Sequence, residues 1–123
     1  MADPKLEFEI SGNLTVDAIY MPEGIKIGDA NSGQTSQNVS AIAIGKGAGK
    51  LTQNIYGVAI GYQAGEENQG SNGVAIGHVA GFFNQGNYGV AIGKGAGYEF
   101  QQQEAIAIGN DAGSQNQESY SIA

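Results

Sequence analysis

Gly57-Val-Ala-Ile-Gly61 and Gly73-Val-Ala-Ile-Gly77 are the same pentapeptide, repeated after 16 residues in a chain of 123. Three further versions keep this interval, namely Ala41-Ile-Ala-Ile-Gly45, Gly89-Val-Ala-Ile-Gly93 and Ala105-Ile-Ala-Ile-Gly109. A fixed period of this length indicates similar structural units that stack on one another. The five copies therefore determine the fold, and the rest of the chain is interpreted around them.

Each copy has the pattern of one short strand followed by a bend. The second and fourth residues are β-branched, as in Val58 and Ile60, and the third is alanine, as in Ala59. Alternation with a period of two is typical of a strand. Gly61 follows this strand and Ala64-Gly65 comes soon after it, and both elements favour tight bends. We predict an all-β fold, a parallel β-roll or β-helix built from 16-residue coils.

The repeats divide the chain into two regions. Residues 1–24 alternate apolar and polar side chains around a turn at Ser11-Gly-Asn13, which predicts an N-terminal β-hairpin that caps or links the roll. Residues 25–123 are the repeat region. It comprises an imperfect copy at 25–40, full copies at 41–56, 57–72, 73–88, 89–104 and 105–120, and a truncated copy at 121–123. Because 121–123 open another copy, we expect the repeats to belong to a longer protein.

The small apolar content of each coil predicts association. We assign the two β-branched side chains of a strand to the interior of the coil, so that the alanine faces the other side. A stripe of alanines would let a second sheet approach closely. The predicted subunit interface consists of Ala43, Ala59, Ala75, Ala91 and Ala107.

A glutamine stands at the same position of every full copy. Stacked one coil apart, the side-chain amides could form a hydrogen-bonded ladder along the long axis. The alternative is a solvated polar residue in a turn. The residues concerned are Gln53, Gln69, Gln85, Gln101 and Gln117.

Other positions vary from copy to copy, and we expect them to face outward. The residue after the strand glycine is Tyr62, His78 or Lys94 in three of the copies. Aromatic residues gather in the loops of two adjacent copies, at Phe82, Phe83, Tyr98 and Phe100. They could form an exposed patch that binds a partner, or they could pack against a neighbouring coil or subunit. The predicted ligand-facing residues are Tyr62, His78, Phe82, Phe83, Lys94 and Tyr98.

Composition argues against several functional classes. The net charge of −7 disfavours nucleic acid, and there is no cysteine for thiolate catalysis or zinc binding. His78 is the only histidine, so no catalytic triad or two-histidine metal site can form within one chain, and we expect a plain exposed side chain. Gly45-Lys-Gly-Ala-Gly-Lys50 lacks the spacing of a phosphate-binding loop. No apolar run reaches the roughly 18 residues of a membrane-spanning helix. We expect no catalytic residue, no metal, no cofactor and no membrane insertion, and therefore not an enzyme.

The Val-Ala-Ile-Gly strand at this spacing resembles the head repeats of trimeric autotransporter adhesins, the YadA-like heads. The resemblance covers residues 41–123 and implies a left-handed β-roll assembled as a homotrimer. This chain departs from that pattern at Ala48 and its equivalents, where those heads usually have serine in a slightly shorter repeat. More loosely, the repeats and the preceding Gly12-Asn-Leu-Thr-Val16 resemble repeat-containing phage tail fibres and attachment fibres of large viruses.

These resemblances imply a structural fibre or adhesin head that displays variable loops for attachment to a cell surface. The implied partners are further copies of the chain and a host-cell surface glycan or protein. The implied location is extracellular, at a cell surface or a virion surface. Two alternatives remain open, a passive spacer or assembly shaft of a viral or phage fibre and an ice-binding solenoid. The absence of threonine rows weighs against the ice-binding alternative.

Overall fold

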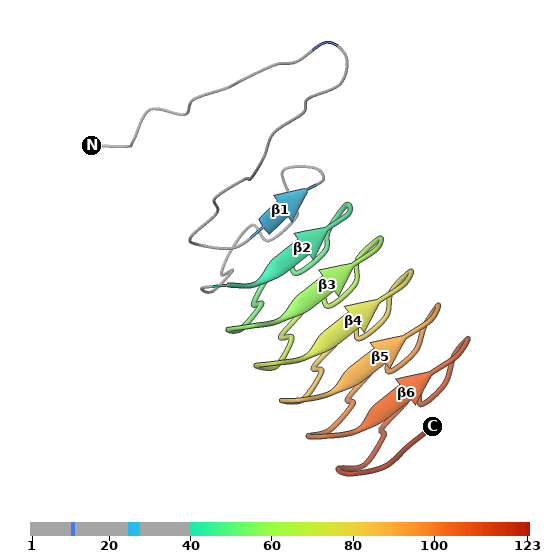
Figure 1. The fold of residues 1–123 in the computed structure, drawn as a ribbon. Coiled ribbons are helices and arrows are strands. Elements are labelled where there is room, and N and C mark those ends of the chain that lie inside the picture. The colour runs from blue at the N-terminus through green and yellow to red at the C-terminus, as the bar shows by residue number, and fades with distance from the viewer. Residues whose placement is uncertain (1–10, 12–24, 28–39) are drawn as a thin grey trace.

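Each Ile-Ala-Ile or Val-Ala-Ile triplet forms a three-residue strand, as its alternation predicts. The computed structural model describes residues 11, 25–27 and 40–123, and in them the strands form an all-β parallel β-solenoid with coils of 16 residues. The strands are β1 (Ile25–Ile27), β2 (Ile42–Ile44), β3 (Val58–Ile60), β4 (Val74–Ile76), β5 (Val90–Ile92) and β6 (Ile106–Ile108). They pair in chain order into one sheet, coil upon coil (Figure 1).

The register keeps equivalent residues side by side. Ala59 of β3 pairs with Ala75 of β4, and Ala75 pairs with Ala91 of β5. The step from β1 to β2 is one residue longer, since Ile25 pairs with Ile42. Every outer or inner position of the coil therefore forms a column that runs along the stack.

Two tight bends close each coil. In the first, the Ala48 amide donates to the Gly45 carbonyl at 3.2 Å, and in the second the Gly57 amide donates to the Asn54 carbonyl at 3.1 Å. The third residue of each bend has a positive φ, 72° at Gly47 and 60° at Tyr56, as in type II turns. The first residue of the first bend also has a positive φ, 119° at Gly45, and glycine occupies this position in every full coil.

The first bends of adjacent coils lie in close contact. Gly77 has a φ of 132°, and a Cβ placed there would lie 2.6 Å from the carbonyl oxygen of Gly93 in the next coil. A methyl group at that distance would overlap the oxygen, so only glycine allows the coils to stack at this column.

A second wall runs between the two bends, and we call it the return segment. It comprises residues 50–54, 66–70, 82–86, 98–102 and 114–118 in successive coils. Backbone hydrogen bonds join the return segments, for example from Glu67 N to Phe82 O at 2.9 Å and from Phe100 N to Phe83 O at 2.9 Å. Sheet and return segments together enclose the interior.

Small side chains fill that interior. The strand alanines Ala43, Ala59, Ala75, Ala91 and Ala107 are fully buried within the single chain. They pack with a second row of alanines that follows the first bend, Ala48, Ala64, Ala80 and Ala96. The β-branched residues on either side of each alanine are only partly buried and face outward.

The expectation that the strand alanines lie at a subunit interface is therefore corrected. Their side chains are enclosed by their own chain and present no surface to a second subunit. The reason is the width of the coil. A Cβ at Gly97 would lie 3.2 Å from the Cβ of Ala91, so the interior has little room for a further methyl group and none for a row of isoleucines.

The repeated glutamines cross this narrow interior. Gln53, Gln69, Gln85 and Gln101 are the largest fully buried side chains of the described residues. In each coil the amide nitrogen donates to two backbone carbonyls of the strand side, as Gln101 Nε2 does to Val90 O at 2.8 Å and to Ala105 O at 2.9 Å. The glutamine therefore ties the return segment to the sheet.

Hydrogen bonds between glutamines also run along the stack, as the ladder hypothesis expects. Gln85 Nε2 donates to Gln101 Oε1, and Gln101 Nε2 donates to Gln117 Oε1, each at 3.2 Å. The Oε1 atoms of Gln53, Gln69 and Gln85 have no hydrogen-bond partner among the described residues. In every full coil the glutamine amide bonds to backbone carbonyls of the strand side, and in the last three full coils the amides also bond to one another.

The predicted N-terminal hairpin lies outside the described residues, apart from Ser11, and so does most of the imperfect copy at 25–40. None of the described segments is a helix with the length and apolar character to cross a membrane.

Candidate functional site

An apolar face covers the outer side of the sheet, and we call it the Val/Ile face. It consists of two columns, Ile42, Val58, Val74, Val90 and Ile106 in one and Ile44, Ile60, Ile76, Ile92 and Ile108 in the other. Nine of these side chains are partly buried, mainly because each column packs against itself. Ile108, in the last strand, is 58% exposed. Nothing else in the described chain covers this face.

The column after the strand glycine carries three of the predicted ligand-facing residues. Tyr62 and His78 are exposed and stack on each other, with ring centroids 5.2 Å apart and planes 14° apart. Lys94 follows in the next coil and is also exposed. These residues are accessible, as expected, and they lie at the first bend and away from the aromatic residues of the return segments.

The other predicted ligand-facing residues lie on the return segments. Phe82 and Tyr98 stack across two coils with centroids 5.1 Å apart, and both are partly buried. Phe83 meets Phe100 edge to face at 5.6 Å and 78°. These aromatic side chains pack between neighbouring coils, as one of the two alternatives expects, and part of their surface stays open to solvent. Binding of a partner by these residues stays a prediction.

The column of Phe82 and Tyr98 begins with a charged pair. Lys50 Nζ lies 3.3 Å from Glu66 Oε1, and the Glu66 carboxylate is almost completely buried. Because a carboxylate loses its hydration on burial, Lys50 is needed to balance its charge. Neighbouring coils are therefore joined at the same column by an ion pair at one place and by an aromatic stack at another.

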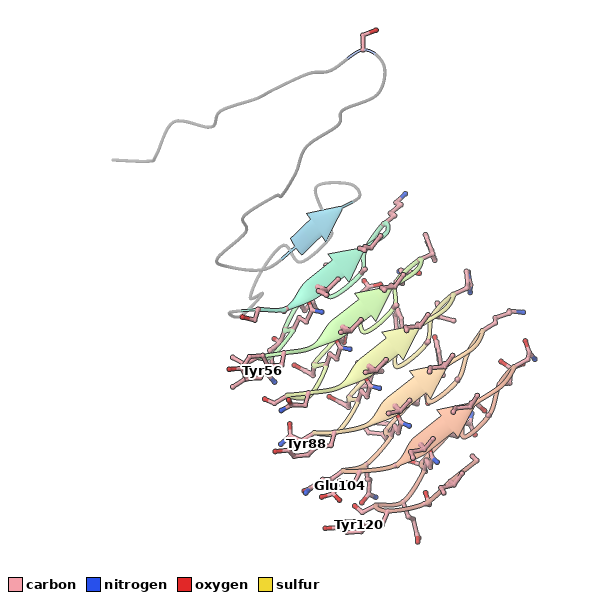
Figure 2. All side chains as sticks on the ribbon, viewed as in Figure 1. Tyr56, Tyr88, Glu104 and Tyr120 are labelled. Carbon is pink, nitrogen blue, oxygen red and sulfur yellow. The ribbon has the colours of Figure 1, made fainter. Side chains whose placement is uncertain are left out.

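A row of exposed side chains marks the second bend. Figure 2 shows Tyr56, Tyr88, Glu104 and Tyr120 pointing outward along one edge of the solenoid. Their φ angles lie between 58° and 62°. The three tyrosines are 59%, 55% and 70% exposed. They do not stack on one another, because Asn72 or Glu104 occupies the same position in the coil between them.

An open, shallow groove of about 460 Å³ lies on the return segments of the last three full coils and extends onto their second bends. Its lining is made of amides, one hydroxyl, one glycine and one aromatic ring, with no ionisable side chain. The lining residues are Asn84, Gly86, Phe100, Gln101, Gln102, Gln103, Asn116 and Ser119. Gln101 lies at its floor, while Phe100 and Gln102 are exposed.

Of these groove residues, the predicted ligand-facing set contains none. Phe100 belongs to the aromatic residues that gather in the loops, but it is not in the ligand-facing set. What sets it apart within its column is that asparagine occupies the equivalent position at 68, 84 and 116. The amides would not attract notice in a glutamine-rich loop. Reading each column for the residue that breaks its pattern is the signal that identifies Phe100.

No group of three or more histidine, aspartate and glutamate side chains within the described residues could hold a metal ion. His78 lies against Tyr62 and is exposed.

Comparison of the sequence and the structure with known families, curated proteins and solved structures returns no match. The arrangement of the Val/Ile face and the groove is therefore the basis for a functional proposal.

Proposed function

We propose that this chain forms part of a homotrimeric fibre or adhesin head at an extracellular surface, in which a rigid solenoid presents variable side chains for attachment to a cell. The observation that carries the proposal is the Val/Ile face. Ten β-branched side chains form a flat apolar surface on one side of a chain whose own core is made of alanines. A contiguous apolar surface that stays partly exposed in the single chain is typical of an interface.

Association through this face explains how so thin a core is stabilised. Three sheets arranged around a common axis would bury each Val/Ile face against the other two, with cyclic symmetry. The outer columns at the first bend and on the return segments would then point away from the axis. The choice of three chains, and a left-handed roll, follow the resemblance of the Val-Ala-Ile-Gly repeats to YadA-like heads.

The first experiment measures the mass of the assembly. Light scattering of the full chain at micromolar concentrations is expected to give three chains, and Val74→Glu is expected to dissociate them because it buries a charge in the apolar face. Leu51→Glu is the matched control, since it places the same charge on an exposed apolar residue of the return segment. A monomeric wild-type chain, or equal loss of assembly in both variants, would contradict the proposal.

The second experiment separates attachment from a purely structural role. Fluorescently labelled assemblies are expected to bind a subset of cells in a panel of bacterial and animal cell types. A stable trimer that binds no cell would favour the passive spacer or assembly shaft. Thermal hysteresis in the same preparation would favour the ice-binding solenoid.

A further inference from the structure

The groove on the return segments has the chemistry of a carbohydrate site. We propose that it binds a neutral oligosaccharide, with Phe100 as the surface on which one sugar ring stacks. The inference rests on the proposed attachment function and gives it a ligand class and a place. Three observations support it, namely the position of the ring, the set of amides around it and the absence of charge in the lining.

Phe100 is an exposed aromatic residue whose backbone has a left-handed conformation. The residue is 46% exposed and its φ is 52°, a left-handed conformation that is uncommon for a bulky residue. Asn84 and Asn116 occupy the same column with φ values of 56° and 47°, and asparagine tolerates this conformation well. The left-handed conformation recurs at several positions of the coil, so what distinguishes Phe100 is an exposed aromatic ring in a column that otherwise has asparagine in three coils.

The ring is also fixed before any ligand arrives. The edge-to-face contact with Phe83 supports Phe100 from the neighbouring coil while its own surface stays open to solvent. The negative face of an aromatic ring attracts the weakly positive C–H groups on the flat side of a sugar ring. A rigid, exposed phenyl group at the side of a groove is therefore suited to stacking.

The surrounding amides offer both donors and acceptors. Asn84 Oδ1 accepts from Asn68 at 3.0 Å, and Gln102 Oε1 accepts from the Ser119 hydroxyl at 3.1 Å. Among the described residues these contacts leave Asn84 Nδ2 and Gln102 Nε2 without an acceptor, so both can donate to a ligand. Sugar hydroxyls are donors and acceptors at once, which matches amide side chains better than it matches charged ones.

Charge decides which sugars fit. The lining contains no lysine or arginine to pair with a carboxylate or sulfate, and the chain carries a net charge of −7. The negative charge of the chain would repel sialylated and sulfated glycans, whereas a neutral oligosaccharide experiences no such repulsion. Because the groove is open and shallow, we expect weak binding to one chain, strengthened by several grooves in one assembly.

The test uses a pair of variants that make the same chemical change. Phe100→Asn installs the residue that the column has at 84 and 116, and Tyr56→Asn does the same at another exposed aromatic residue with a φ of 60°, whose column has Asn72 in the next coil. Both changes put asparagine where the left-handed backbone favours it, so neither is expected to lower the melting temperature.

The full chain and both variants are applied to an array of neutral, sialylated and sulfated oligosaccharides, followed by calorimetric titration with the strongest neutral binder. We expect the wild type and Tyr56→Asn to bind neutral glycans equally, and Phe100→Asn to bind at least about tenfold more weakly, as expected for loss of an aromatic hot spot. Binding only to acidic glycans, no glycan binding, or equal binding by Phe100→Asn would each overturn the inference.

The same preparations distinguish this inference from the proposed function. If the chain forms trimers and binds cells but Phe100→Asn binds them as well as the wild type, attachment stands and the groove does not carry it. If the wild type is monomeric and still binds neutral glycans through Phe100, the groove stands and the fibre does not.

Discussion

Gln85 Nε2 donates a hydrogen bond to Oε1 of Gln101, one coil further along the stack, at 3.2 Å. Both side chains are almost completely buried, and both also bond to backbone carbonyls on the strand side of their own coils. A single residue type at one repeat position thus joins the two walls of a coil and joins that coil to the next.

Gln101→Ala is expected to destabilise the fold strongly. It removes the bonds to Val90 O, Ala105 O and Gln117 Oε1 and leaves a cavity in the interior. We expect a loss of about 2–4 kcal/mol in the free energy of unfolding, measured by urea titration. Gln115→Ala, at an exposed position of the return segment, is expected to change it by less than about 0.5 kcal/mol. Equal effects would show that the buried amide is not a structural tie.

Gly77→Ala and Gly109→Ala form a second matched pair. The two glycines have nearly the same φ, 132° and 129°, so the conformational penalty is shared. At Gly77 the new methyl group would meet Gly93 O at 2.6 Å, whereas at Gly109 the nearest atom is the Ala112 Cβ at 3.8 Å. We expect Gly77→Ala to be the more destabilising by about 1–3 kcal/mol in thermal or urea unfolding, from overpacking alone. Similar losses in both variants would contradict direct stacking of the bends.

Ala75→Val tests which side of the sheet is inside. Ala75 is fully buried beside Gly81, whose added Cβ would lie 3.2 Å from the Ala75 methyl, so two more methyl groups have no space. We expect a loss of about 1–3 kcal/mol. Val74→Ile adds one methylene on the outer face, where Ile42 and Ile106 already occupy the equivalent position, and is expected to be nearly neutral. If Val74→Ile were more destabilising than Ala75→Val, the alanines would face outward and the assignment of the interior would be wrong.

Lys50→Met removes the cation beside the buried Glu66 carboxylate. Because the Lys50 side chain is itself 35% exposed, we expect a loss of about 1–2 kcal/mol, below the range for a fully buried pair. Lys50→Met combined with Glu66→Gln is expected to recover most of that loss, since no unpaired charge remains. Urea unfolding of the two single variants and the double variant gives the coupling energy. A coupling energy near zero would show that the pair does not stabilise the stack.

The period, the strand positions and the parallel stack could all be predicted from the sequence, because the spacing of Val-Ala-Ile-Gly leaves little choice of register. The sequence did not predict which face of each strand points into the coil. Alternation shows that Val58 and Ala59 face opposite sides, and assigning the larger side chain to the interior is correct for most sheets. Here the two bends bring the walls so close that only alanine and an extended glutamine fit between them.

The sequence predicted which residues face outward, but it did not predict which of them contact one another. The variable residues Tyr62 and His78 face solvent, as expected, but their mutual stacking depends on which coils are neighbours in space. Phe100 was visible only as one more loop aromatic residue. The structure shows that Phe100 shares a left-handed backbone conformation with Asn84 and Asn116 in the same column, and the sequence alone does not show this.

The alternation of large outer and small inner side chains also bears on how the coils find their order. Alanine and glutamine recur inside every full coil, so the interior would accept a coil from any position in the stack. The outer contacts differ at each step, with an ion pair between Lys50 and Glu66 and an aromatic stack between Phe82 and Tyr98 in the same column. A chain that slipped by one whole coil during folding would keep its interior and lose these pairs. The repeated interior residues therefore determine the structure of each coil, and the outer contacts, which differ between coils, favour the correct order of the coils.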